Sequence, residues 1–252
     1  MKNKKMAVAG ISLLGSIGVI STGFAGWIIS APAQSGTGTG SITADGTVET
    51  KGSLTLGTVT YDSGAAGSIR FAANKDTAGK GWLTSNDTTK AKLSTTITVP
   101  MTIGTDVNKI NFTNVKLEAT NKAANYQELA KAGIVGTLPT LKTATGDENT
   151  TEGSIVITTV KPTAASIDTN SLNAGSISTK EFGAGFTDAS FKFTVNFAWG
   201  TKFGGKNPMD YYNGEPWSST LEKDAAETIA KLNQLNGVGF TLSFTVSAGS
   251  AN

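Results

Sequence analysis

The sequence predicts an all-β domain, a jelly-roll-like β-sandwich with two short helices in its connections. Three observations lead to this prediction. About eight stretches show the two-residue alternation of apolar side chains that is typical of strands. Thr and Val, which favour strands, and Gly and Asn, which favour tight turns, are abundant in the same region. Only two stretches have helical spacing, and many short strands separated by turns are typical of sandwiches and jelly rolls.

The first residues predict an N-terminal signal, an apolar helix in front of this domain. Residues 1–5 are basic, residues 6–20 are apolar, and small residues follow at 23–25 and again at 31–33. This order is typical of a secretory signal peptide. We expect a signal peptide over residues 1–25, with residue 33 as an alternative end. The competing interpretation is an uncleaved membrane anchor, because the apolar stretch to Ile29 is long enough to span a bilayer.

The rest of the chain divides into a short leading segment and one domain. Residues 26–50 contain the Gly/Ser/Thr-rich run APAQSGTGTG and a weak strand signal at 41–48, so we expect a flexible or extended segment. Residues 51–252 carry the stronger strand patterns, and about 200 residues are enough for one well-formed core. We therefore expect a single β-sandwich domain from residue 51 onwards.

The strand candidates differ in strength. The strongest is 189–199, where every second residue is large and apolar. The pair 92–103 and 109–119 is the best antiparallel candidate, and Pro100 predicts an edge or a bulge in its first member. We expect the stretch 161–187 to be largely irregular. The full set of strand candidates is 41–48, 53–61, 68–72, 92–103, 109–119, 155–160, 189–199 and 238–246.

The two helix candidates have recognisable ends. Residues 121–132 place Tyr126, Leu129 and Ala130 on one face, and Gly133 follows as a C-terminal cap. The second helix begins with the capping box Ser219-x-x-Glu222 and ends near Leu235, before an Asn-Gly pair. Its apolar stripe indicates packing on the core.

Composition excludes several kinds of chemistry. The chain contains no Cys and no His, which removes Ser-His-Asp and Cys-His machinery and the usual zinc ligands. Net charge is +2 and the Lys residues are scattered, so we expect no nucleic-acid binding. We interpret Asp147, Glu148 and Glu152 as a solvated loop, not as a calcium site. We therefore predict no enzyme activity, no cofactor and no metal, although 19 acidic residues leave a carboxylate pair open.

The segment 199–217 is dense in aromatic residues, Gly and Pro. One interpretation is an exposed aromatic platform for a glycan or a neighbouring subunit, formed by Phe203, Tyr211, Tyr212 and Trp217. The other is a structured loop that folds over one end of the core. We favour the second.

Both ends of the chain carry short family motifs. They are the Lys-rich start with its apolar stretch, residues 21–27 (STGFAGW), residues 52–56 (GSLTL), and the last strand 240–246 with the helix before it. Together they resemble the TasA and camelysin family of exported bacterial surface and biofilm-matrix fibre proteins. The resemblance implies a jelly-roll domain that is processed by a dedicated signal peptidase and assembled into fibres with copies of itself or related matrix subunits.

In that family, the segment just after the cleavage site acts as a donor strand for the next subunit. An added strand satisfies the unpaired N–H and C=O groups of an open sheet edge. By position, the resemblance implies a donor strand between residues 26 and 48. The assembly candidates are Trp27, Ile28, Ile29, Ile42 and Val48. Cleavage after Ala33 would remove the first three. The metallopeptidase class given to some relatives does not carry over, because the chain has no HExxH motif.

We therefore expect a secreted structural subunit of a cell-surface or extracellular-matrix fibre that assembles by donor-strand exchange. Its membrane contact would be limited to an uncleaved N-terminal segment, and its partners to itself, related subunits and the signal peptidase. The alternative is a surface adhesin or glycan-binding module that uses the aromatic 199–217 segment.

Overall fold

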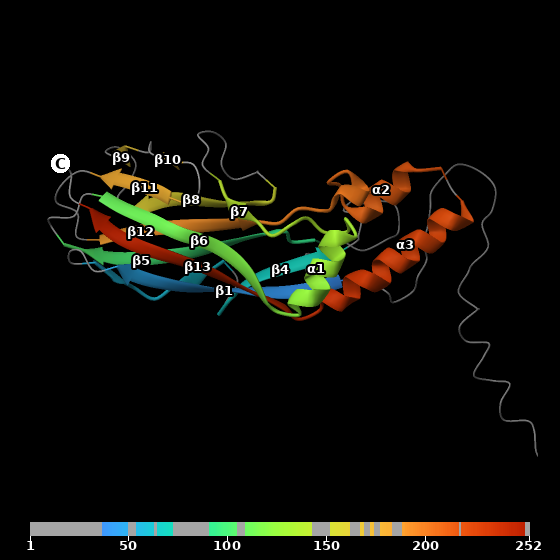
Figure 1. Ribbon diagram of the computed structural model, residues 1–252, viewed down its shortest axis with the longest axis horizontal. Helices are drawn as coiled ribbons and strands as arrows, with labels where there is room; N and C mark the ends of the chain where they lie inside the picture. Colours follow the sequence, from blue (N-terminus) through green and yellow to red (C-terminus); the bar gives the residue numbers. More distant parts are fainter. Residues whose placement is uncertain are drawn as a thin grey trace, which may run out of the picture.

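The protein consists of two β-sheets packed face to face, with helices at one end of an elongated body (Figure 1). The computed structural model describes residues 37–49, 54–62, 65–72, 91–104, 109–142, 152–161, 167–168, 172–173, 177–182, 188–216 and 218–249. Both sheets are mixed and the helices are short, so the prediction of an all-β sandwich is confirmed at this level. The predicted signal peptide and the assembly candidates Trp27, Ile28 and Ile29 lie outside the described residues.

The first sheet has seven strands in the order β10-β11-β6-β13-β1-β4, with β9 paired to β11. Every pairing in it is antiparallel except that of β1 with β13. Its strands are β1 (Thr37–Glu49), β4 (Gly67–Ala72), β6 (Lys109–Asn121), β9 (Ile167–Asp168), β10 (Leu172–Asn173), β11 (Ile177–Phe182) and β13 (Val238–Gly249).

The second sheet has six strands in the order β2-β5-β12-β8-β7, with β3 also paired to β5. Short β2 and β3 cover different parts of the same side of β5. Its strands are β2 (Leu54–Leu56), β3 (Thr60–Tyr61), β5 (Ser94–Ile103), β7 (Thr140–Leu141), β8 (Ser154–Lys161) and β12 (Asp188–Asn196). Only β7 with β8 is parallel here.

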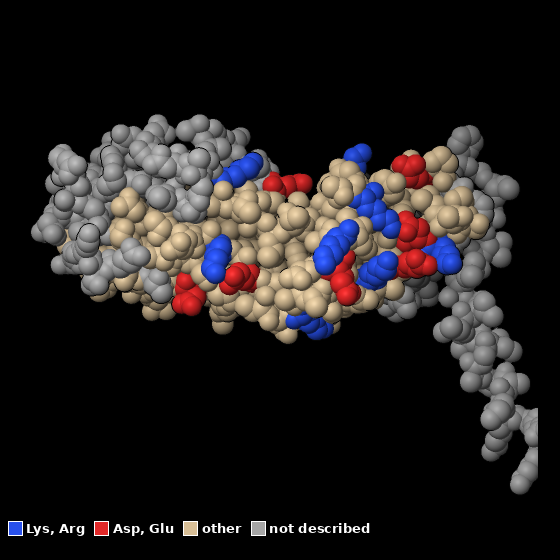
Figure 2. Space-filling view, viewed as in Figure 1, with Lys and Arg blue, Asp and Glu red and all other residues tan. Residues whose placement is uncertain are grey.

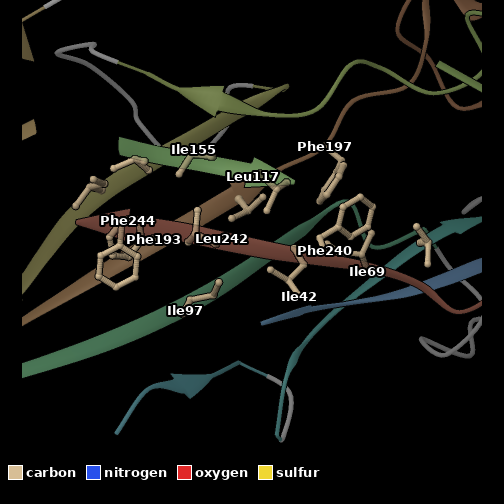
Figure 3. Close-up of a cluster of buried hydrophobic side chains, with 14 of the residues drawn as sticks. Ile42, Ile69, Ile97, Leu117, Ile155, Phe193, Phe197, Phe240, Leu242 and Phe244 are labelled. Carbon is tan, nitrogen blue, oxygen red and sulfur yellow. The ribbon is translucent and has the colours of Figure 1, made fainter. Parts of the chain in front are cut away.

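Aromatic side chains join the two sheets across the core (Figure 3). Phe193 of β12 stacks on Phe244 of β13 with ring centroids 4.7 Å apart. Phe197, directly after β12, lies 4.9 Å from Phe240. All four are buried. The alternation that predicted strands 189–199 and 238–246 therefore supplies the two facing layers of the core.

The predicted pairing of 92–103 with 109–119 is wrong. The corresponding strands lie in opposite sheets, with β5 next to β12 and β6 next to β13. Both strands have an inward face of buried apolar side chains, so the two faces meet across the core instead of lying side by side in one sheet. The expected irregularity at Pro100 is confirmed. Its carbonyl accepts from the Gly57 N–H at 2.7 Å, in the gap between β2 and β3 where no ladder donor is needed.

Helices gather at one end of the sandwich (Figure 1). They are α1 (Ala123–Lys131), α2 (Pro208–Gly214) and α3 (Ser219–Leu232), with short 3-10 turns η2 (Thr201–Phe203) and η3 (Asn233–Leu235). Both predicted helices are present, but the N-cap of α3 is Ser218, whose Oγ accepts from the Leu221 N–H at 3.1 Å, and not Ser219. No described helix is long and apolar enough to cross a bilayer.

One helix and three short strands were not expected from the sequence. Helix α2 begins at an Asn207 cap with Pro208 in the first helical position, a start signal inside the aromatic segment. Strands β9, β10 and β11 form within 161–187, which we expected to be irregular. Strand β11 reads ISTKEF and has no apolar alternation to indicate a strand.

Candidate functional site

Strand β1 contains Ile42 and Val48, two of the residues that the sequence suggested for assembly. It is an interior strand of the first sheet, between β13 and β4. Residues 37–49, which we placed in a flexible segment outside the domain, are therefore part of the sandwich, and the expected boundary at residue 51 is corrected. Ile42 is completely buried among core side chains, and Val48 is partly buried.

The inward positions of β1 carry small side chains. Gly38, Gly40, Ala44 and Gly46 alternate along this face, which also carries the large residue Ile42 and, near its end, Val48. A Cβ atom added at Gly38 would lie 2.4 Å from the Cβ of Leu235, and one at Gly46 would lie 2.5 Å from Cζ of Phe244. The backbone of β1 therefore lies directly on large side chains of η3 and β13. We call this position of β1, between β13 and β4 and against η3, the β1 seat.

The two sides of β1 are paired over different lengths. The parallel register with β13 runs from Gly40↔Val238 to Glu49↔Ser247, whereas the antiparallel register with β4 covers only Thr37 to Ile42. The N–H of Ala44 then donates to the Tyr61 hydroxyl at 3.1 Å. Among the strands that the structure describes, none pairs with β1 on this side beyond Ile42.

The start of β1 is tied to the turn that leads into β13. The Thr39 hydroxyl donates to Oδ1 of Asn236 at 2.5 Å, and the Gly237 N–H donates to the Thr39 carbonyl at 2.7 Å. Asn121 and Lys122, at the end of β6, donate to the backbone carbonyls of Gly237 and Asn236. These contacts fix the turn that receives β1.

The aromatic segment 199–217 lies mainly in the interior. Phe203 and Tyr212 are 1% and 2% exposed, so the prediction that they form a surface platform is wrong. Tyr211 is half-buried, and the three rings contact one another with centroids 5.4 to 5.7 Å apart. Trp217 lies outside the described residues. The rings have folded together because α2 turns this segment back over the end of the core, as in our favoured interpretation.

A polar cluster joins this segment to α3. The Lys202 ammonium contacts Oδ1 of Asp224 at 2.6 Å, and the Tyr212 hydroxyl lies 2.8 Å from both Oδ2 of Asp224 and Oγ1 of Thr228. We call these four residues the Asp224 cluster. Figure 2 shows charged side chains of both signs gathered over this end of the viewed face.

Burial and hydrogen bonds shift the pKa values of two groups in this cluster. Burial raises the pKa of Tyr212 far above its ordinary value, so the phenol remains a hydrogen-bond donor. Partial burial of Asp224 works against its ionisation, but hydrogen bonds from Lys202 and Tyr212 outweigh it and hold the pKa of Asp224 below its ordinary value. Neither group is tuned to exchange protons near neutral pH.

Other acidic side chains of the described residues lie apart from this cluster. Asp62 pairs with Lys92 at 3.2 Å and accepts from Thr95 at 2.7 Å, while Asp210 and Glu215 are exposed. Glu152 is exposed, and its predicted loop partners Asp147 and Glu148 lie outside the described residues. Within the described ranges, no three acidic side chains are grouped to hold a metal ion.

Sequence reasoning missed two features of these sites. Asp224 and Thr228 fall on the apolar stripe of the predicted helix, four residues apart, and this interruption was the available signal. The alternating glycines of β1 were interpreted as flexibility, although their period of two matches the inward face of a strand.

Comparison of the chain with known proteins gives no relative. No protein-family model matches it, and neither a curated protein nor a solved structure is significantly similar to it.

Proposed function

We propose that the protein is an exported structural subunit of a cell-surface or extracellular-matrix fibre, with its sheets arranged as a jelly roll, and that subunits exchange β1. The β1 seat is the observation that supports this proposal. It holds an N-terminal strand by backbone pairing to β13 and β4 and by close contact with small inward side chains. Such a seat fits the same strand from a second copy equally well.

The structure also changes the form of the proposal. The strand that we expected to be free lies in its own sheet, so assembly requires β1 to leave its seat and be replaced by the β1 of a neighbour. An exchanged β1 makes the same contacts with β13, β4 and η3 in the neighbouring copy as it makes in its own. If each copy donates to the next, the contact is head-to-tail and the chain of subunits is open.

The adhesin alternative has less support. Its candidate aromatic residues Phe203 and Tyr212 are buried, and Tyr212 is engaged with Asp224 and Thr228. A ligand would have to unpack the end of the core to reach them. We therefore assign no glycan-binding or catalytic role.

A cysteine pair tests strand exchange directly. Thr43 and Thr241 are register partners on the outward faces of β1 and β13, and neighbouring strands are about 4.8 Å apart, which suits a disulfide. The chain has no other cysteine. The double variant Thr43→Cys/Thr241→Cys is assembled at high concentration under reducing conditions, oxidised, and separated on a denaturing gel without reductant.

The cross-linked products distinguish the two states. A ladder of covalent multimers supports the proposal, because each disulfide then joins two chains. Monomers with an internal disulfide contradict it, and dimers alone contradict the open fibre. The single variant Thr43→Cys is the control for chance cross-linking, since it cannot produce more than dimers.

A further inference from the structure

We propose that the pairing of β1 with β13 is a mechanical clamp that makes the domain resist tension. The inference concerns a single folded copy and does not depend on strand exchange. It rests on three observations: the direction of the two strands, the length of their register, and the glycine contacts beneath β1.

The direction of the strands determines how force acts on them. β1 and β13 are parallel neighbours, and tension that enters before Thr37 and leaves after Gly249 pulls on the start of one and the end of the other. The two strands are then pulled in opposite directions along their common axis. Their backbone hydrogen bonds are perpendicular or slanted to that axis. The applied force therefore shears the ladder.

The length of the register determines how many bonds resist together. Ten consecutive positions are paired, from Gly40↔Val238 to Glu49↔Ser247. In shear, these bonds stretch at the same time, whereas in peeling they break one after another from an end. Rupture under force is governed by the unfolding rate, so a barrier at which many bonds break together gives a larger rupture force.

Each of the two strands also pairs with a further strand on the side that faces away from the β1–β13 ladder. β13 pairs with β6 along almost its whole length, from Gly239↔Asn121 to Gly249↔Lys109. β1 pairs with β4 from Thr37 to Ile42. Tension at the start of β1 must therefore break the β4 pairing as well before the strand can move.

The glycine pattern blocks sliding. The smallest slip that keeps the same face of a strand inward is two residues. Under tension at its start, β1 would move so that Ile42 took the place of Gly40. Even a Cβ atom there lies 2.7 Å from Cγ1 of Val238 and 2.9 Å from its carbonyl oxygen. The larger side chain of Ile42 would therefore clash with Val238 of β13. This clash opposes a two-residue shift of the ladder.

Single-molecule pulling in two directions tests the clamp. In the shear arrangement, the processed chain is held by handles fused before Thr37 and attached after Gly249. In the peeling arrangement, the second handle is instead attached through Gln234→Cys, an exposed site in η3 beside the start of β1. We expect a rupture force several-fold higher in shear at the same pulling speed. Equal forces in the two arrangements would overturn the proposal.

A matched pair of variants locates the resistance. The backbone groups of successive residues in a strand point to opposite sides. The N–H of Ala44 points away from β13, and the carbonyl of Thr39 points toward the turn before β13. The N–H of Asp45 therefore points toward β13. Asp45→Pro removes that donor, and Asp45→Ala keeps it. We expect the proline variant to lower the shear force and the alanine variant to leave it unchanged. An unchanged shear force in a folded Asp45→Pro protein would count against the clamp. If that variant does not fold, the comparison of shear and peeling forces in the unsubstituted protein tests the clamp.

The result of the pulling experiment can be distinguished from that of the cross-linking experiment. Pulling acts on one molecule whose β1 is in its own seat, whereas the cysteine ladder requires β1 in the seat of another. A strong shear response with only internal disulfides would retain the clamp and reject the fibre.

Discussion

The strand body and the helical end of the molecule are stabilised by different interactions. In the body, Phe193 and Phe244 stack between two sheets and β1 lies on β13 through small side chains and backbone pairing. At the helical end, Lys202, Asp224 and Tyr212 connect η2, α3 and α2 through charged hydrogen bonds. The comparison teaches that size and shape dominate the packing between the sheets, where Asp62 and Lys92 add a partly exposed ion pair, whereas charged hydrogen bonds hold the helical end together.

The largest effect should come from opening the core of the body. Phe193→Ala removes a ring that stacks on Phe244 and contacts Phe112 edge-on at 5.4 Å. We expect the free energy of unfolding to fall by about 3–5 kcal/mol, because both the transfer of the ring and the remaining cavity are unfavourable. Urea denaturation followed by fluorescence measures this loss. A loss below that of Tyr212→Phe would show that the body does not dominate stability.

Filling the β1 seat should have the next largest effect. In Gly38→Ala, the new methyl group meets the Cβ of Leu235 at 2.4 Å and the carbonyl oxygen of Leu232 at 2.9 Å. We expect a destabilisation of about 1–3 kcal/mol from overpacking, together with faster hydrogen exchange in β1. The control is Gly214→Ala, because an added Cβ at Gly214 meets nothing within 4 Å. Equal effects of the two variants would contradict the tight seat.

Removing one hydroxyl should weaken the helical end by less. Tyr212→Phe deletes the donor to Asp224 and the contact with buried Thr228. We expect a loss of about 1 kcal/mol in the free energy of unfolding. Hydrogen exchange should increase in α2 and α3 and stay unchanged in β12. The comparison variant is Tyr211→Phe, which removes a hydroxyl from the same aromatic group without altering the Asp224 cluster.

The smallest effect should be a dependence on pH that comes from Asp224 at the helical end. The pKa of Asp224 is lower in the folded protein than its ordinary value of about 4. The group therefore contributes stability above pH 4, and this contribution is lost as the pH falls through the lower, folded pKa. Lys202, Tyr212 and Lys231 are the groups that lower this pKa, against the opposing effect of burial.

Asp224→Asn tests this dependence. The difference in unfolding free energy between wild type and variant should be present at pH 7 and shrink as the pH is lowered below 4. We expect a small difference, because the Asp224 carboxylate is partly solvated. If this difference in unfolding free energy grows on acidification, the pKa of Asp224 is not lowered in the folded protein.

The sequence predicted the strands that line the core and not the way they pair. The alternation in 189–199 and 238–246 identifies both facing layers, because a buried face of large side chains leaves a local pattern. The pattern is the same whether two strands are neighbours in one sheet or face each other across the core. This is why β5 and β6 were assigned to one pair. The parallel pairing of β1 with β13 joins segments from the two ends of the domain, and no local signal reports it.

In the candidate sites, too, local sequence patterns predict some features, whereas others depend on distant elements that meet in the fold. The folding of residues 199–217 over the core was our favoured interpretation, since a run of Tyr, Phe and Trp next to a core strand has apolar area to bury. The Asp224 cluster depends on three elements meeting at one end, which the spacing within each element does not encode. In β1, Gly indicates both flexible linkers and close backbone contact, and only the structure reveals the second role at Gly38 and Gly46.

The parallel pairing of β1 with β13 also sets the order in which the protein can be completed. Thr39 and its hydrogen-bond partner Asn236 are 197 residues apart in sequence. A strand made early must therefore wait, with its partner missing, until the last part of the domain has been synthesised. Contacts so distant in sequence close slowly. During that interval β6 and β1 lack the strand that lies between them in the finished sheet, so the newly made chain passes through a form in which the place of its last strand is vacant.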